Sequence, residues 1–278
     1  MGAMTSIAVL GGGKIGESLI SGLVKSSEVN AGDIKVSNRR QERADELSEA
    51  YGVTTTLDNA EAVAGADVVF VAVKPPKVAG VLEEVAGALK EAGNPVVVSL
   101  AAGIGLDALQ KPVAEGTPVV RVMPNTPMMV GRGVCAVSRA DNVSDEQLTL
   151  VEDLLSTVGR VVAVDEANMD AVTALSGSSP AYIYLVAESL IDAGVQLGVP
   201  RAQAVELVTG AVAGAGDMLT GSGDGPAQLR INVSSPGGTT VHALRELEES
   251  GIRGAFFRAA EACAERSAEL GKPAGKDD

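Results

Sequence analysis

Short apolar runs alternate with amphipathic stretches over the first part of the chain. The runs that predict strands lie at residues 6–10, 34–37, 67–73, 95–100, 117–123, 134–138 and 160–164. The segments that predict helices between them lie at residues 18–24, 60–64, 75–92 and 145–157. The run 67–73 (DVVFVAV) is almost continuously apolar, which is typical of a strand buried on both faces of a parallel sheet. Residues 4–165 are therefore predicted to form an α/β domain with a mostly parallel sheet.

The pattern changes after Asp165, where long amphipathic segments follow one another without a strand. The predicted helices lie at residues 166–175, 181–197, 201–219, 227–232, 241–249 and 252–270. They are rich in alanine, glycine and leucine, so they can pack closely and leave apolar surface for another subunit. Residues 166–272 are predicted to be an all-α domain for substrate binding and dimerisation, and residues 273–278 a disordered polar tail.

A glycine-rich turn joins the first predicted strand to the first predicted helix. Gly11, Gly13 and Gly16 have the spacing G-x-G-x-x-G in the strand, turn and helix context that this motif requires. Gly11 permits the tight turn, Gly13 lets a pyrophosphate approach the backbone, and Gly16 allows close packing of helix on strand. The first domain is therefore predicted to be a Rossmann-type domain that binds NAD(P).

The residues after the second strand bear on the choice of nicotinamide cofactor. Sites that prefer NAD usually carry Asp or Glu here to bind the ribose 2′-hydroxyl, but this chain has Ser37, Asn38, Arg39 and Arg40. Two guanidinium groups suit a 2′-phosphate, so NADPH is expected, with NADH as the alternative. Arg39 and Arg40 could instead be a solvated start of the next helix.

Small or polar residues follow three other strands. Lys74 comes directly after the strand at 67–73, Ala101 and Ala102 follow the strand at 95–100, and Asn125 lies in the loop after 117–123. Ligands of doubly wound sheets bind outside the carboxyl ends of the strands. These residues are therefore candidates for the cofactor site.

A second candidate site lies in the helical domain. Ser234, Ser235 and a Pro-Gly-Gly turn, in which Gly237 and Gly238 lack a Cβ atom, precede Thr239, Thr240 and an amphipathic helix. The free N–H groups and positive dipole end of such a helix favour a carboxylate or phosphate. The simpler interpretation is an ordinary capped helix with a glycine hinge.

Few residues of the helical domain can move a proton. His242 is the only histidine, and no lysine lies between Lys111 and Lys272. His242 fits a packing or hydrogen-bonding role better than an acid–base role, and the same holds for Tyr182 and Tyr184. Oxidation of an alcohol needs such a group, whereas a cyclic imine arrives already protonated and mainly needs positioning. The inventory therefore favours reduction of a C=N bond.

Composition narrows the range of partners. The chain has 22 basic and 36 acidic residues, a net charge of −14, and only 2% aromatic residues, which argues against nucleic acid and anionic membranes. A signal peptide and a membrane span are not predicted, and a cytoplasmic location is expected. Cys135 and Cys263 are far apart and have no partner at metal-ligand spacing, so neither a disulfide framework nor a metal site is expected.

Several stretches together resemble the pyrroline-5-carboxylate reductase family. The most specific is residues 226–248, which contain Ser-Ser-Pro-Gly-Gly-Thr-Thr. The supporting stretches are residues 11–16, 38–39, 72–75, 121–127 and 174–177. The resemblance covers nearly the whole chain and implies reduction of 1-pyrroline-5-carboxylate to L-proline, the last step of proline biosynthesis, by a homodimer, with a ring of dimers as an alternative. One departure is Ser179, because the family usually has glycine there.

The resemblance also implies roles for single residues. Those implied to hold the cofactor are Gly13, Lys14, Ile15 and Gly16 at the pyrophosphate, Asn38 and Arg39 at the adenosine phosphate, Asn59 near the adenine, and Val73, Lys74, Pro75, Ala101 and Ala102 along the ribose and nicotinamide, with Ala72 in the same stretch. Those implied to bind the substrate carboxylate are Ser235, Gly237, Gly238 and Thr239. Thr240 would hydrogen-bond the ring nitrogen and is the candidate catalytic residue.

Two other functions remain open at this point. A reductase of a different cyclic imine, such as a six-membered homologue, would use the same groups. A non-catalytic sensor that binds NADP would explain the lack of an obvious acid–base residue, although the intact segment from Ser234 to Thr240 counts against it.

Overall fold

The computed structural model describes residues 5–26 and 29–271, so the predicted start at Met4 and the predicted tail at 273–278 lie outside the described residues. The chain divides into two compact units. Unit 1 contains the residues up to Ser178 and those from Ala262 onward, and unit 2 contains Ser179–Glu261. The structural division thus falls later than residue 165, because the residues that follow 165 bond to the sheet. The functional division at 165 stays a prediction.

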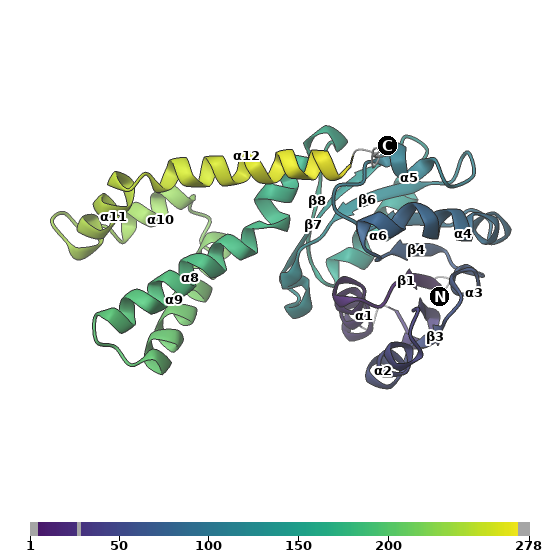
Figure 1. The fold of residues 1–278 in the computed structure, drawn as a ribbon, viewed down its shortest axis with the longest axis horizontal. Helices are drawn as coiled ribbons and strands as arrows, with labels where there is room; N and C mark the ends of the chain where they lie inside the picture. The colour runs from purple at the N-terminus through teal and green to yellow at the C-terminus, as the bar shows by residue number, and fades with distance from the viewer. Residues whose placement is uncertain (1–4, 27–28, 272–278) are drawn as a thin grey trace, which may run out of the picture. The chain divides into compact units, whose positions relative to one another are not determined.

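Unit 1 is built on an eight-stranded sheet with the order β3-β2-β1-β4-β5-β6-β7-β8 (Figure 1). Its strands are β1 Ile7–Leu10, β2 Ile34–Ser37, β3 Thr54–Thr56, β4 Val68–Val71, β5 Val96–Ser99, β6 Val119–Met123, β7 Gly133–Arg139 and β8 Gly159–Ala163. All neighbouring strands are parallel except β6 and β7. The link between those two is too short for the crossover that parallel strands need. The predicted Rossmann-type, mostly parallel sheet is confirmed.

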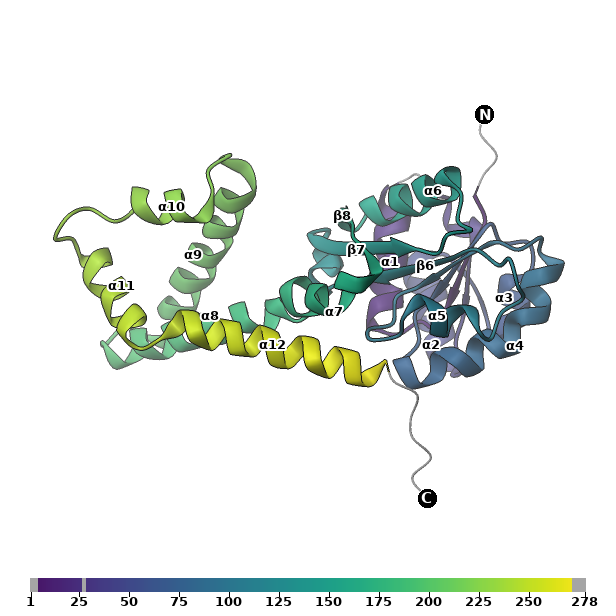
Figure 2. The same cartoon turned by 90° about the horizontal axis from the view of Figure 1, so that it is seen from above.

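Helices cover both faces of this sheet (Figure 2). They are α1 Lys14–Ser26, α2 Gln41–Tyr51, α3 Asn59–Val63, α4 Val78–Glu91, α5 Leu106–Gln110, α6 Asp145–Ser156 and α7 Met169–Val172. Helix α1 packs beside α2, α3 packs beside α4, and α4 packs beside α5. This grouping is expected when right-handed connections build the sheet outward on both sides of β1. The central strands β1, β4 and β5 are fully buried between these layers, which explains their continuous apolar sequences.

The segment predicted as one helix at 166–175 consists of three shorter turns. A 3-10 turn, η4 Glu166–Asn168, precedes α7, and a π-turn, η5 Thr173–Gly177, follows it. In the π-turn the Ser178 N–H donates to the Thr173 carbonyl oxygen at 2.8 Å. The hydroxyls of Thr173 and Ser176 donate to backbone carbonyls four residues earlier, a contact that bends helices. The prediction of one regular helix was wrong for this reason.

Unit 2 is all-helical. It contains α8 Ser179–Gln196, α9 Arg201–Gly221, α10 Pro226–Asn232, α11 Thr239–Glu249 and the first part of α12 Ile252–Leu270. Each of these helices was predicted, and no helix among the described residues of the chain has the length and apolarity needed to span a membrane.

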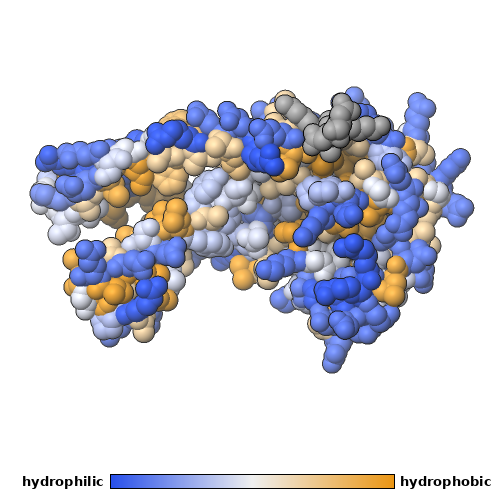
Figure 3. Space-filling model, viewed as in Figure 1, coloured by the Kyte–Doolittle hydropathy of each residue, from blue (hydrophilic) through white to orange (hydrophobic). Residues whose placement is uncertain are grey.

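Unit 2 buries almost nothing of its own. Ala204, on α9, is its only buried residue, and every residue from 179 to 261 is described. Large apolar side chains are exposed on α8 and α9, among them Leu185 at 62% and Leu207 at 66% (Figure 3). A helical unit without a core is incomplete as a folded body.

Candidate active site

The carboxyl ends of four strands meet in one row. Leu10 of β1 is in register with Ser37 of β2 and with Val71 of β4, and Val71 is in register with Ser99 of β5. Backbone hydrogen bonds continue this pairing past the strand ends. The Gly11 N–H donates to the Ser37 carbonyl at 3.1 Å, and the Ala72 N–H donates to the Leu10 carbonyl at 2.8 Å. The predicted residues after β1, β2, β4 and β5 therefore lie along one edge.

The glycine turn between β1 and α1 has the geometry that a pyrophosphate site needs. Gly11 has φ +106°, and a Cβ atom there would lie 2.9 Å from the Ala72 carbonyl oxygen. Gly16 packs against the Gly11 carbonyl group, so a side chain there would also collide. By contrast, a Cβ atom on Gly13 would meet nothing within 4 Å, which leaves this backbone open to a ligand. Helix α1 begins directly afterwards at Lys14, with Ile15 in the same turn, and its dipole favours an anion.

The end of β2 carries two exposed arginines beside a tethered asparagine. Within the described chain, no ion pair or side-chain hydrogen bond is recorded for Arg39 or Arg40, whose side chains are exposed. The Asn38 side chain accepts a hydrogen bond from the Arg40 N–H at 3.3 Å. The Ser37 hydroxyl donates to Asn59 Oδ1 at 2.6 Å, so Asn59 lies beside the end of β2, while its place near the adenine stays a prediction. The two guanidinium groups are available to a phosphate.

The residues after β4 and β5 differ in exposure. Lys74 is exposed and precedes the 3-10 turn η2 Pro75–Lys77, in which Pro75 takes the first position. Ala72 and Val73 are half-buried beside it, and Ala101 is buried next to half-buried Ala102. Lys74 is the only cationic residue between the end of β4 and the start of η2.

The Asn125 side chain, in the loop after β6, bridges two other segments of unit 1 by hydrogen bonds. It is buried, its Oδ1 accepts from the Val134 N–H at 2.8 Å, and its Nδ2 donates to the Ser176 carbonyl oxygen at 2.9 Å. The side chain thus links β7 and the π-turn to the loop after β6. Contact between Asn125 and the cofactor stays a prediction.

Sequence reasoning missed a cluster on α2. The Arg43 Nε donates to the Gly12 carbonyl oxygen at 2.9 Å, and the same guanidinium pairs with Glu17 of α1. Arg43 stands four residues before Leu47, so both side chains lie on the helix face that meets the glycine turn. That spacing is visible in the sequence, but the contact with residue 12 depends on the packing of α2 beside β1.

The segment before α11 in unit 2 forms the predicted turn. Gly237 has φ +70°, and the Gly238 N–H donates to the Ser235 carbonyl at 3.0 Å. The N-cap of α11 is Gly238, which has no side chain to accept from the first turn, so α11 does not have the side-chain cap that the simpler interpretation assumed. The Ser234 hydroxyl is already used, because it donates to the Arg230 carbonyl at 2.6 Å.

The other candidate side chains of unit 2 have modest roles. His242 is exposed, and its Nδ1 lies 3.0 Å from the Gly238 carbonyl oxygen, which fits the expected hydrogen-bonding role. Tyr184 is 62% exposed and Tyr182 is half-buried. Ser179, the departure from the family pattern, is the half-buried first residue of α8.

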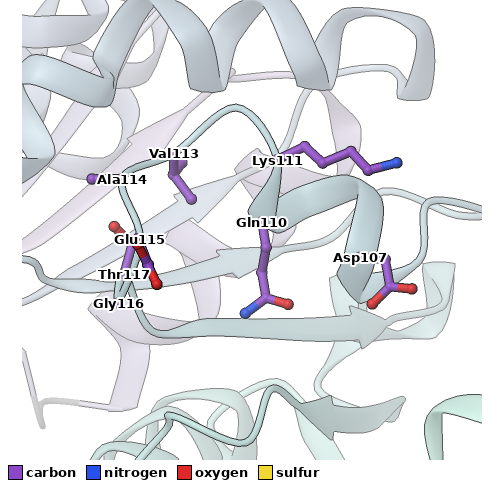
Figure 4. A pocket seen from close by; sticks show the side chains of 8 residues that line it. All are labelled: Asp107, Gln110, Lys111, Val113, Ala114, Glu115, Gly116 and Thr117. Carbon is purple, nitrogen blue, oxygen red and sulfur yellow. The ribbon is translucent and has the colours of Figure 1, made fainter.

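A surface pocket elsewhere has no part in this arrangement (Figure 4). Its lining residues are Asp107, Gln110, Lys111, Val113, Ala114, Glu115, Gly116 and Thr117. They precede β6 and therefore lie at the amino end of that strand, opposite the edge where ligands of such sheets bind. None of the predicted site residues lines this pocket.

Two family models match the chain. The model described as pyrroline-5-carboxylate reductase dimerisation matches residues 166–270. The model described as NADP oxidoreductase coenzyme F420-dependent matches residues 6–103. The two matches fall on the predicted helical domain and on the part of the sheet that carries the glycine turn.

Relatives match over nearly their full length. The chain is 55% identical over 270 residues to a pyrroline-5-carboxylate reductase of Corynebacterium melassecola, which covers 97% of this chain and 100% of the relative. It is 35% identical over 266 residues to the pyrroline-5-carboxylate reductase of Escherichia coli strain K12, which covers 96% of this chain and 98% of the relative.

Solved structures agree with the sequence relatives. A pyrroline-5-carboxylate reductase from Coxiella burnetii has a TM-score of 0.92 and 36% identity, with 98% of this chain and 100% of that one covered. A Plasmodium falciparum pyrroline carboxylate reductase with NADP bound has a TM-score of 0.87 and 29% identity, with 97% and 100% covered. By its glycine turn, its serine-rich turn before α11 and these full-length matches, the chain belongs to the pyrroline-5-carboxylate reductase family.

Proposed function

We propose that this protein reduces 1-pyrroline-5-carboxylate to L-proline with NAD(P)H. The observation that carries the proposal is the uncapped start of α11 after the Ser-Ser-Pro-Gly-Gly turn, in a chain 55% identical to a reductase of that substrate along its length. The open space beside Gly13 fits the second requirement of the reaction, which is a site for a dinucleotide cofactor.

The cofactor would be held at the edge of the sheet in unit 1. The Gly13 backbone and the first turn of α1, with Lys14, would bind the pyrophosphate through N–H groups and the helix dipole. Asn38 and Asn59 would line the adenosine end, and Val73, Lys74 and Ala102 would lie along the ribose and nicotinamide. When bound, the reduced nicotinamide supplies a hydride.

The substrate would be held by the first turn of α11. Its carboxylate would accept hydrogen bonds from the backbone of Gly238 and Thr239 and from the Ser235 hydroxyl, with Gly237 leaving room for close approach. The Thr240 hydroxyl would bond to the ring nitrogen. Because the imine would arrive already protonated, these residues would only have to hold its C=N carbon open to a hydride and would not have to deliver a proton. Positioning then accounts for most of the catalysis.

We further propose that NADPH is preferred to NADH. Arg39 and Arg40 are exposed at the end of β2, where a 2′-phosphate would lie, and no ion pair is recorded for either side chain in the described part of the chain. An acidic residue that would bind a free 2′-hydroxyl does not occur between Ser37 and Arg40.

We also propose a homodimer formed through unit 2 and a cytoplasmic location. The exposed apolar side chains of α8 and α9 would be covered by the same helices of a second copy. Cys135 and Cys263 are both free thiols, as is usual in a reducing compartment. Fractionation of producing cells tests the location, and enzyme activity confined to the medium would contradict it.

The test of function is the absorbance of NADPH, and then of NADH, in the presence of purified protein and racemic 1-pyrroline-5-carboxylate. We expect the absorbance to fall only when substrate is present. At the same amount of enzyme, it should fall faster with NADPH than with NADH. A faster reaction with a six-membered cyclic imine would favour the alternative reductase. Cofactor binding without any turnover would favour the sensor and would overturn the proposal.

A further inference from the structure

A side-chain cluster joins α1 to α2 behind the glycine turn. Arg43 donates from Nε to the Gly12 carbonyl at 2.9 Å and from Nη1 to Glu46 at 2.8 Å, while its Nη2 pairs with Glu17. The Tyr51 hydroxyl donates to the same Glu17 at 3.1 Å. The Arg43 side chain is only 19% exposed and that of Glu17 is 31% exposed, so their contact is partly sheltered from bulk water, whereas Glu46 is 62% exposed.

The Arg43 contact fixes the orientation of one peptide of the glycine turn. In a trans peptide the C=O of Gly12 and the N–H of Gly13 point in opposite directions. Because the Gly12 carbonyl is held toward Arg43 on α2, the Gly13 N–H is directed away from that arginine. Leu47 supports the same peptide, since a side chain on Gly12 would collide with its Cδ1 atom. Three glycines in a row would otherwise sample many conformations.

The same arginine offsets a charge that works against phosphate binding. Glu17 lies in the first turn of α1, the end of the helix that would face the pyrophosphate. An unpaired carboxylate there would repel the phosphates. Arg43 and Tyr51 both contact this carboxylate, and desolvation together with the charge of Glu17 raises the pKa of Tyr51.

We propose that Arg43 is a positioning residue for the pyrophosphate of the cofactor, an inference that rests on the proposed nicotinamide site. Each of its three nitrogens already makes one contact, with Gly12, Glu46 or Glu17, so the role proposed for Arg43 is to act through the glycine turn. The pyrophosphate is common to both cofactors. Loss of Arg43 therefore weakens NADPH and NADH equally, unlike loss of Arg39.

The test compares Arg43→Ala and Arg43→Lys with Glu46→Gln, which removes an exposed partner but leaves the Gly12 contact. Dissociation constants for NADPH and NADH are measured by calorimetry, together with KM and kcat. Arg43→Ala should weaken both cofactors about tenfold with kcat nearly unchanged, and Glu46→Gln should change neither. Arg43→Lys should fall between them, because an ammonium cannot hold Gly12 and Glu17 at once. If Arg43→Ala does not fold, Arg43→Lys alone decides.

Arg43 is proposed to act in two ways, by holding the Gly12 carbonyl and by offsetting the charge of Glu17. Adding Glu17→Gln to Arg43→Ala separates these two contributions to cofactor affinity. The double variant should remain several-fold weaker than the wild type, because the Gly12 carbonyl is still unsupported. The proposal would be overturned if the double variant regained the full cofactor affinity of the wild type. It would also be overturned if Arg43→Ala weakened NADPH alone, or if it lowered the melting temperature without changing either affinity. If the wild type binds nucleotide but does not reduce the imine, only the proposed substrate fails and the affinities still test Arg43. If it binds neither nucleotide, both proposals fail.

Discussion

Thr240 and Arg39 are each proposed to make one contact with a ligand, and a substitution can remove that contact. Thr240 lies in the first turn of α11, next to backbone N–H groups without a side-chain cap. Arg39 is exposed after β2. Both assignments can be separated from effects on folding, since neither side chain is part of the core.

Thr240→Ala should lower kcat about tenfold while the affinity for NADPH stays nearly constant, because one hydrogen bond to the reacting ring is lost. Steady-state kinetics at saturating NADPH measure this. Thr220→Ala is a matched control, since the Thr220 hydroxyl bonds only to the backbone of its own helix α9. An unchanged kcat in Thr240→Ala would remove Thr240 from the mechanism.

Arg39→Ala should raise the KM for NADPH by about tenfold and change the KM for NADH by less than a factor of about two. The reason is that only NADPH has a 2′-phosphate, which would lose the guanidinium that binds it. The control is Arg160→Ala, which removes an exposed arginine from the distant strand β8. Equal effects on the two cofactors would show that Arg39 does not meet the 2′-phosphate.

The element scale shows what sequence pattern can and cannot predict. Buried strands such as β4 were found because both of their faces are apolar, whereas β3 was missed because Thr54–Thr56 is short, polar and partly exposed at the sheet edge. The row of site residues followed from the strand ends. The Arg43 contact did not follow, since it joins parts of the chain whose proximity only the fold decides. The π-turn η5 did not follow either, because its local bonds are not visible in the apolar periodicity.

A partly buried ion pair, in which Arg121 is buried and the Glu166 side chain is 34% exposed, fixes the segment after β8 to the sheet. Arg121 on β6 has a side chain 6% exposed and lies 2.6 Å from Glu166, which also accepts from the Leu106 N–H at 3.1 Å. Arg121→Ala should lower the free energy of unfolding by about 3 kcal/mol, because Glu166 loses its partner in a sheltered site. The control Arg139→Ala breaks an exposed pair with Asp145 and should cost less than about 1 kcal/mol. Denaturant unfolding measures both, and equal losses would contradict the argument.

At the scale of the whole molecule, the two units differ in what they bury. Unit 1 has a continuous core around its sheet, and unit 2 has Ala204 as its only buried residue. Sequence pattern located the helices of unit 2 but could not separate apolar residues that face a core from those that face another chain, because both produce the same periodicity.

Leu207→Glu on α9 should convert the proposed dimer to a monomer and lower its thermal stability, because a carboxylate would enter the apolar surface that a second copy would cover. Light scattering after size exclusion measures the mass. The control Leu57→Glu changes a leucine of unit 1 with 53% exposure and should leave the mass unchanged. A wild-type protein that is monomeric at micromolar concentration would overturn the dimer.

Because unit 2 has almost no core of its own, its folding in the proposed dimer would require two chains to meet. If its apolar faces are completed only by a second chain, mass action sets the fraction of folded helices, and the melting temperature rises with total protein concentration. A chain with a damaged cofactor site but intact helices would still pair with normal chains. Cells that produce both would then carry mixed dimers, in which a chain with a defect confined to unit 1 is paired with a chain whose own sequence is sound.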